Sequence, residues 1–153
     1  MSRSNISRRV WSAGWAPHSV LALHSALAVL VGHRRELDPL FHFLGGTAGA
    51  YGLLRTFDVF PELARAVGVL DRSVTIVVAM AAVALLWELA EFASDRLLGT
   101  HIQQGLFDTG SDVVLGVAGA AVTAVVVRIA AARSEMRSIP PLRPTSGGKV
   151  REK

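Results

Sequence analysis

Acidic residues and a histidine stand at helical spacing inside otherwise apolar stretches of this chain. Residues three or four apart lie on the same face of a helix. This spacing holds within three groups: Glu88, Glu91 and Asp95; Asp108 and Asp112; and Asp38 with His42. So many carboxylates at close range cannot all be ionised without compensation. A bound cation, shared protons, or pairing with His42, His101 or Arg96 would provide it.

Carboxylates together with one imidazole suit a hard or borderline divalent ion such as Mg²⁺, Mn²⁺ or Zn²⁺. The predicted metal ligands are His42, Glu88, Glu91, Asp108 and Asp112. Further ligand-binding residues are predicted beside them: Asp38, Asp95 and Gln104. The chain has no cysteine, which excludes a thiolate metal site or a disulfide. No serine-nucleophile, Walker or Glu-x-x-His pattern is present, so no catalytic residue is assigned.

Most of these residues also have a structural interpretation. The alternatives are a helix cap from Ser111 or Asp112, an interfacial pair of Asp95 with Arg96, a Glu91 that reaches the headgroups, and bundle-internal hydrogen bonds from His24 or His42. Glu88 is harder to explain in this way, because it follows a long apolar run. An ionisable residue inside a membrane segment marks a functional site by default.

The elements that must position these groups are membrane helices. Hydrophobic residues make up 51% of the 153 positions, and the mean hydropathy is +0.42. Four apolar segments approach the roughly 20 residues that cross a bilayer: residues 10–32, 39–57, 73–93 and 112–132. We therefore predict an all-α membrane protein with a bundle of four transmembrane helices. The first segment is predicted to be retained as a helix instead of being cleaved as a signal peptide.

This assignment divides the chain into three parts. Residues 1–9 are predicted to be a basic N-terminal tail, residues 10–133 the transmembrane domain, and residues 134–153 a disordered basic C-terminal tail. The net charge of +4 resides mainly in the flanks of the apolar segments, which favours contact with lipid over nucleic acid. Placing both tails and the loop between the second and third helices on one side collects 13 of the 16 Lys and Arg residues there. That side is expected to be cytoplasmic, so the acidic residues lie near the outer face.

Two stretches of the chain are similar to one another. At an offset of 70 residues, Asp38 matches Asp108, His42 matches Asp112, and the pattern continues through matched glycines and alanines: Gly46 and Gly116, Ala48 and Ala118, Gly49 and Gly119, and Ala50 and Ala120. This similarity indicates two repeated helical hairpins, an arrangement in which a site forms at the interface between the repeats.

At these positions the sequence resembles the VanZ-like superfamily of bacterial integral membrane proteins. The motifs are Asp-x-x-x-His-Phe from Asp38, Glu-x-x-Glu from Glu88, and Gln-Gly-x-x-Asp-Thr-x-x-Asp from Gln104. The last two are similar to an uncharacterised branch of that superfamily. The superfamily usually has glutamine where Glu91 stands and asparagine where Gly116 stands. The resemblance implies a multi-pass protein of the bacterial cytoplasmic membrane and a role in the cell envelope.

Three functions agree with this sequence. The first is a cell-envelope protein whose outer acidic and histidine cluster binds a divalent cation or an amphiphilic ligand. The second is a metal-dependent membrane enzyme acting on a lipid-linked phosphate, with Glu88 or Glu91 as base. The third is a component of a proton or ion pathway through His24, His42 and the carboxylates. Four short helices would need to oligomerise for this last function, so the expected partners are lipid, a second copy or another membrane protein.

Overall fold

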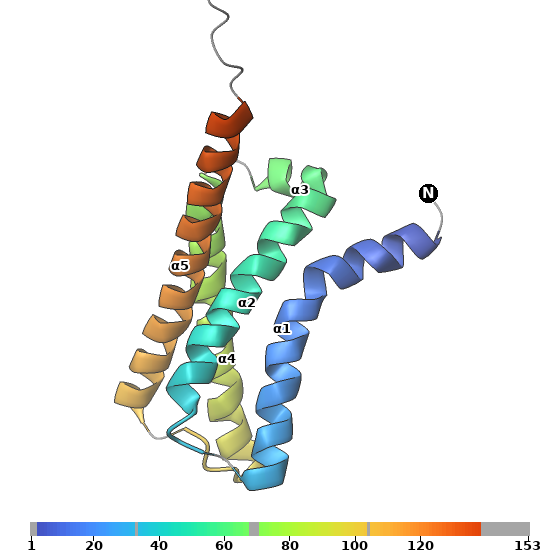
Figure 1. The fold of residues 1–153 in the computed structure, drawn as a ribbon. Helices are drawn as coiled ribbons and strands as arrows, with labels where there is room; N and C mark the ends of the chain where they lie inside the picture. The colour runs from blue at the N-terminus through green and yellow to red at the C-terminus, as the bar shows by residue number, and fades with distance from the viewer. Residues whose placement is uncertain (1–2, 33, 68–70, 104, 139–153) are drawn as a thin grey trace, which may run out of the picture.

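The described residues form helices joined by short connections. The computed structural model describes residues 3–32, 34–67, 71–103 and 105–138. Its elements are α1 (Arg3–Val31), α2 (Asp38–Val59), α3 (Pro61–Ala66), α4 (Arg72–Leu98) and α5 (Leu106–Ser138). The helices α2 and α5 begin at the same end of the bundle and run in parallel, whereas α1 and α4 run the opposite way (Figure 1). The prediction of an all-α fold is confirmed for these residues.

Three helices are long and apolar enough to cross a membrane. The candidate spans are Val10–Val31, Arg72–Leu98 and Leu106–Arg137. The 22 residues of α2 are long enough, but the helix is less apolar because it contains Asp38, His42, Arg55, Asp58 and several glycines. It packs against α5, α1 and α4, so much of its surface faces protein instead of lipid. Three spans are therefore found in the described part of the chain, and the fourth remains a proposal.

The helices extend beyond the predicted segments. α5 begins at Leu106, directly after Gly105, and continues to Ser138. α1 begins at Arg3, inside the predicted N-terminal tail. Helices propagate more easily than they nucleate, and the sequence has no proline after residue 132 until Pro140. Residues 139–153 of the predicted C-terminal tail lie outside the described residues.

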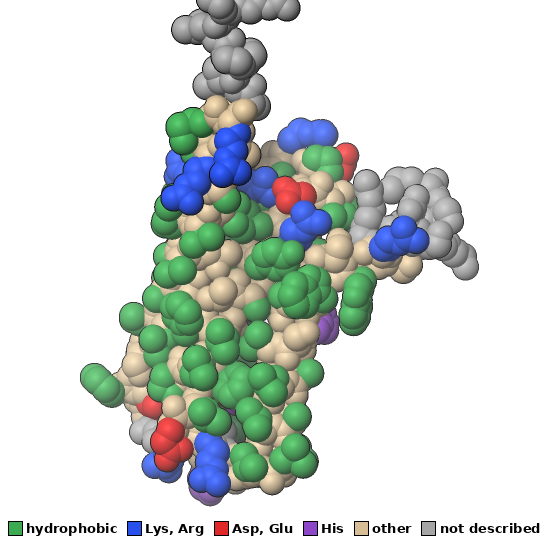
Figure 2. All heavy atoms as spheres, viewed as in Figure 1, with side chains coloured by type: hydrophobic (Ala, Val, Ile, Leu, Met, Phe, Trp, Pro, Cys, Tyr) green, Lys and Arg blue, Asp and Glu red, His purple; other side chains and the backbone are tan. Residues whose placement is uncertain are grey.

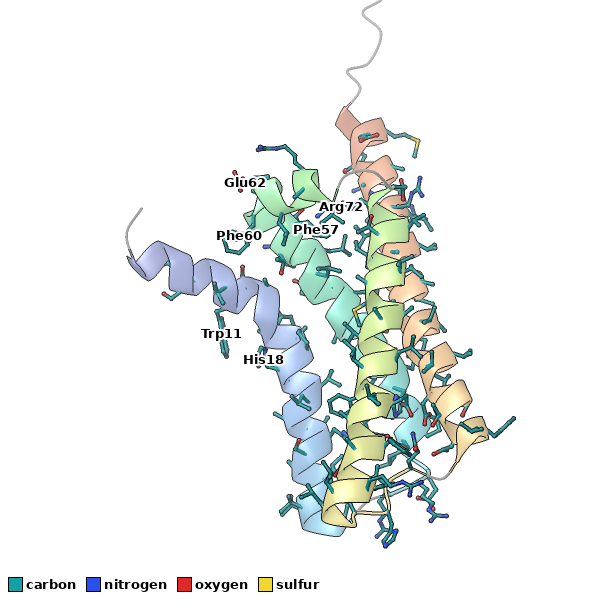
Figure 3. The ribbon with its side chains drawn as sticks, turned by 180° about the vertical axis from the view of Figure 1, so that it is seen from behind. Trp11, His18, Phe57, Phe60, Glu62 and Arg72 are labelled. Atoms are coloured by element: carbon teal, nitrogen blue, oxygen red, sulfur yellow. The ribbon has the colours of Figure 1, made fainter. Side chains whose placement is uncertain are left out.

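Pro17 bends α1. A proline in a helix donates no hydrogen bond to the carbonyl four residues earlier, and its ring crowds that carbonyl. The N-terminal part of α1, with exposed Trp11, therefore leans away from the bundle (Figures 1 and 3). The carbonyl of Ala13 instead lies against Gly52 of α2, where an added Cβ would come within 2.9 Å of it. Gly52 thus permits close packing of α1 on α2 at the bend.

A small apolar core and one arginine hold together the end of the bundle at which α2 finishes. The core residues are Ala50, Leu54, Phe57, Ile76, Met80 and Ala120. Nη2 of Arg72 donates hydrogen bonds to the Leu54 carbonyl at 2.8 Å and to Asp58 Oδ1 at 2.6 Å. Its guanidinium lies 5.8 Å from the centre of the Phe57 ring (Figure 3). These contacts join the start of α4 to the end of α2.

Candidate metal centre

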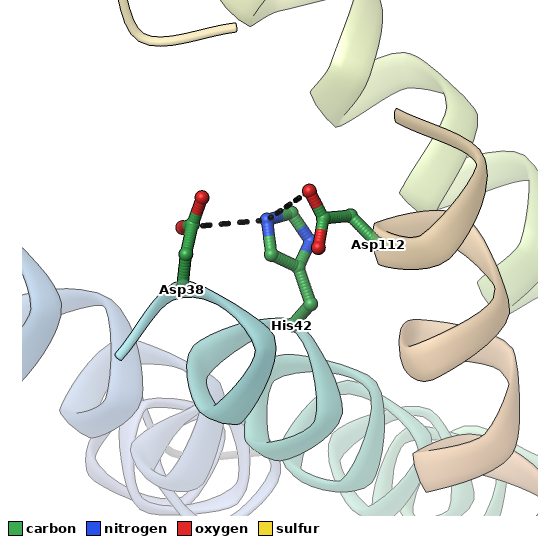
Figure 4. A group of neighbouring side chains, drawn as sticks. All are labelled: Asp38, His42 and Asp112. Carbon is green, nitrogen blue, oxygen red and sulfur yellow. Dashed lines mark ion pairs between the residues drawn. The ribbon is translucent and has the colours of Figure 1, made fainter. Parts of the chain in front are cut away.

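At the other end of the bundle, buried carboxylates from three helices surround the imidazole of His42. They are Asp38 of α2, Glu88 and Glu91 of α4, and Asp112 of α5, each 9% exposed or less. On one side of the ring, His42 Nε2 lies 3.6 Å from Asp38 Oδ1 and 3.7 Å from Asp112 Oδ2 (Figure 4). On the other side, Nδ1 lies 3.7 Å from Glu88 Oε1.

These contacts define two sets of donor atoms that share His42. Asp38, His42 and Asp112 form one set, and His42, Glu88 and Glu91 form the other. Within each set, the donor atoms lie within 4.8 Å of one another. Each set could therefore hold a metal ion, with the imidazole between them.

Glu88 has the least compensated charge of the cluster. Its side chain is 5% exposed, and neither carboxylate oxygen has a hydrogen-bond partner among the described residues. Burying a carboxylate without such partners is costly unless positive charge lies close to it. The imidazole of His42 supplies at most one positive charge against the buried carboxylates. A bound cation, or protons shared among the carboxylates, could balance the remaining negative charge of the cluster.

Glu91 is held by a residue that the spacing argument did not identify. Trp87 Nε1 donates a hydrogen bond to Glu91 Oε1 at 2.7 Å. Trp87 lies one helical turn before Glu91, and this spacing of four residues would have predicted contact between the two side chains. Because Glu91 is 9% exposed, its side chain does not extend to the surface, as the headgroup interpretation required.

Close packing of α2 on α5 sets the register of the cluster. A Cβ added to Gly46 would overlap the backbone of Gly116, and one added to Gly119 would overlap the carbonyl of Phe43. Small residues permit such close approach of helix backbones in membranes. Gly46 follows His42 by one turn, and Gly116 follows Asp112 by one turn. The glycine contact therefore brings His42 and Asp112 to the same level.

The remaining predicted site residues lie elsewhere or outside the description. The Asp95 side chain accepts hydrogen bonds from Thr100 Oγ1 and from the amides of Ile102 and Gln103, at 2.6 to 2.9 Å, and so holds the loop after α4. Asp108 lies in the first turn of α5 and belongs to neither donor set. Gln104 lies outside the described residues. Asp112 is well inside α5, which begins at Leu106, so it does not act as the N-cap.

The fold and the cluster define a class of protein: a helical membrane protein with ionisable side chains buried between its helices. The chain matches the family described as "Predicted membrane protein (DUF2238)" over residues 9–133 and therefore belongs to this family. No curated protein and no solved structure matches the chain. The family match supports a membrane protein and is neutral on the VanZ-like resemblance.

Proposed function

We propose that this chain is a VanZ-like protein of the bacterial cell envelope that binds one divalent cation through Asp38, His42 and Asp112. The observation that carries the proposal is the distance from His42 Nε2 to the two carboxylates, 3.6 and 3.7 Å. These distances exceed those of good hydrogen bonds. Two ligands about 2.1 Å from one ion, at tetrahedral or trigonal angles, lie roughly 3.4–3.6 Å apart. The spacing therefore fits donors to a shared ion.

Glu88 has a supporting role in this proposal. Histidines that bind metal through one nitrogen usually donate the other N–H to a carboxylate, which fixes the tautomer and the ring orientation. Glu88 Oε1 is 3.7 Å from Nδ1, on the side of the ring away from Asp38 and Asp112. A small approach of Glu88 to the ring would form this hydrogen bond. Glu91, held by Trp87, adds negative charge close to the cation.

The proposal places the site on the outer side of the cytoplasmic membrane. The 13 Lys and Arg residues that the orientation argument groups together flank the ends of the helices opposite His42, or lie in the tails. With both termini in the cytoplasm, the beginnings of α2 and α5 face the outside. In this orientation, a ligand would reach the cluster from the outer side of the membrane and not from the cytoplasm.

Elemental analysis of the purified protein tests the cation site. We expect about one Zn²⁺ or Mn²⁺ per chain after loading and dialysis, and a large loss of metal in Asp112→Asn. The matched control is Glu62→Gln, which removes a carboxylate that is 75% exposed in α3 and should leave the metal content unchanged. A parent protein that retains no metal would refute the proposal, whether or not Asp112→Asn folds.

A further inference from the structure

A cavity of about 240 Å³ lies between α1, α2 and α4, directly beside the cluster. Most of its wall is apolar, with Val20 and Leu21 from α1, Phe41 from α2, and Met80 and Val83 from α4. On α2, Gly45, Gly46 and Gly49 also line it. Of these three, only Gly45 has open space where a Cβ would stand, whereas a Cβ on Gly46 would meet Gly116 and one on Gly49 would meet Met80.

One end of the cavity is polar because His42 lines both the cavity and the metal centre. His24 of α1 is a second imidazole in the wall, and its ring lies 4.7 Å from that of Phe41, centre to centre. From His42 the lining continues to Gly49, seven residues or about 10 Å along α2. The cavity therefore extends from a charged end toward the apolar middle of the bundle.

This gradient matches an amphiphile with an anionic head and a hydrocarbon chain. Pockets with largely apolar walls and a few polar groups at one end are typical binding sites for such ligands. Three protein ligands leave coordination positions open on a divalent cation, and Mg²⁺ in particular is often shared between carboxylates and the phosphate of a ligand. Without the cation, the carboxylates would repel an anionic head. A lipid head is thus expected to bind only after the metal.

We propose that the cavity receives part of one hydrocarbon chain of a lipid whose head is a phosphate monoester, and that the terminal phosphate oxygens complete the coordination of the cation. This inference rests on the proposed cation site. It adds the class of the ligand, the direction in which the ligand lies, and a role for Gly45 of α2. Gly45 is a suitable position for a test, since a Cβ added there meets nothing within 4 Å. A leucine at this position would enter the cavity without displacing the backbone.

Trp87 lines the cavity and can report on a bound chain. The protein has three tryptophans, so Trp11→Phe with Trp15→Phe leaves Trp87 as the single tryptophan, which can be excited selectively. This reporter protein is placed in vesicles that contain a small, equal fraction of either phosphatidate or phosphatidylcholine with brominated chains. Bromine quenches tryptophan on contact. We expect clearly stronger quenching by the phosphatidate than by the phosphatidylcholine, because only the phosphatidate has a terminal phosphate to bind the cation.

Two comparisons decide whether that selectivity comes from the cavity and the cation. EDTA should abolish it, and Gly45→Leu should abolish it while Mn²⁺ binding is kept. The matched control is Gly110→Leu, a helical glycine of α5 that is exposed and also has open space around its Cβ. Equal quenching by both lipids, or selectivity that survives EDTA, would overturn the lipid proposal. Retained Mn²⁺ binding in that case would leave the cation site standing, and its absence would overturn both.

Discussion

The two ring nitrogens of His42 face different carboxylates. Nε2 faces Asp38 and Asp112, which come from two helices, whereas Nδ1 faces Glu88. If a cation occupies the Nε2 side, the proton must reside on Nδ1, where Glu88 is the acceptor. The same geometry explains how a carboxylate without hydrogen-bond partners is tolerated at a buried position. With a cation on the Nε2 side, the N–H at Nδ1 would be the donor that Glu88 lacks among the described residues.

Replacing Glu88 with glutamine keeps the size of the side chain and removes its charge. The imidazole would then bind the cation less strongly, because an amide oxygen is a weaker acceptor for Nδ1–H than a carboxylate. We expect Mn²⁺ affinity to fall roughly 10- to 100-fold, as measured by titration with detection of free Mn²⁺ by electron paramagnetic resonance. Glu62→Gln provides the matched control. Parent-like affinity in Glu88→Gln would exclude a supporting role for this residue.

At the level of the helices, the parallel pair of α2 and α5 is what assembles the site. Gly46 and Gly116, which match one another in the 70-residue offset, are in contact in the structure. Thr123 Oγ1 adds a hydrogen bond to the carbonyl of Thr47 at 3.3 Å across the same interface. The hypothesis of two repeated hairpins, in which His42 and Asp112 are equivalent positions, stays a prediction from the sequence.

The α2–α5 contact can be tested with alanine. Gly46→Ala would push a methyl group into the backbone of Gly116, and such overpacking costs about 1–3 kcal/mol. Gly110→Ala is the control, because its Cβ meets nothing within 4 Å and alanine favours the helix by up to about 1 kcal/mol. Thermal unfolding in detergent, followed by circular dichroism, should show a lower Tm for Gly46→Ala only. Equal Tm values would mean that the helices are not in close contact at Gly46.

Helical spacing predicts part of this arrangement. Glu88 and Glu91 share a face by their separation of three residues, and the structure brings both to His42. Asp95 lies on the same face, but its carboxylate accepts hydrogen bonds from two amides of the loop after α4. Helical periodicity does not predict such contacts with a loop. The predicted fourth apolar segment begins at Asp112, six residues after the first residue of α5, because Ser111 and Asp112 resemble a helix cap whereas the helix begins after Gly105. The spacing predicts Asp38 as a ligand-binding residue, and in the structure its carboxylate lies 3.6 Å from His42 Nε2.

Over the whole molecule, charge is segregated toward the ends of the bundle. Apolar side chains cover the middle of the face seen in Figure 2, and basic side chains gather where α5 and α3 end. At that end, Arg128 Nη1 also lies 3.5 Å from Asp71 Oδ1 in the loop before α4. The excess of Lys and Arg at this end predicts that it faces the cytoplasm.

Single cysteines test this orientation, since the chain has none of its own. Suitable positions are Glu36, in the exposed loop between α1 and α2, and Glu62, which is exposed on α3 at the opposite end. The two variants are Glu36→Cys and Glu62→Cys. A membrane-impermeant maleimide added to intact cells should label Glu36→Cys, and should label Glu62→Cys only after lysis. Labelling of both in intact cells would be inconsistent with α2 as a fourth span. The opposite pattern would place the cluster on the cytoplasmic side.

Direct binding of a divalent cation by His42, as we propose, can be measured. Pulsed electron paramagnetic resonance of the Mn²⁺-loaded protein detects a coordinated nitrogen through its coupling to the metal. We predict a nitrogen coupling in the parent protein that disappears in His42→Gln and persists in His24→Gln, which changes the other imidazole of the cavity wall. A coupling that survives in His42→Gln, or a parent protein that holds no Mn²⁺, would contradict the claim.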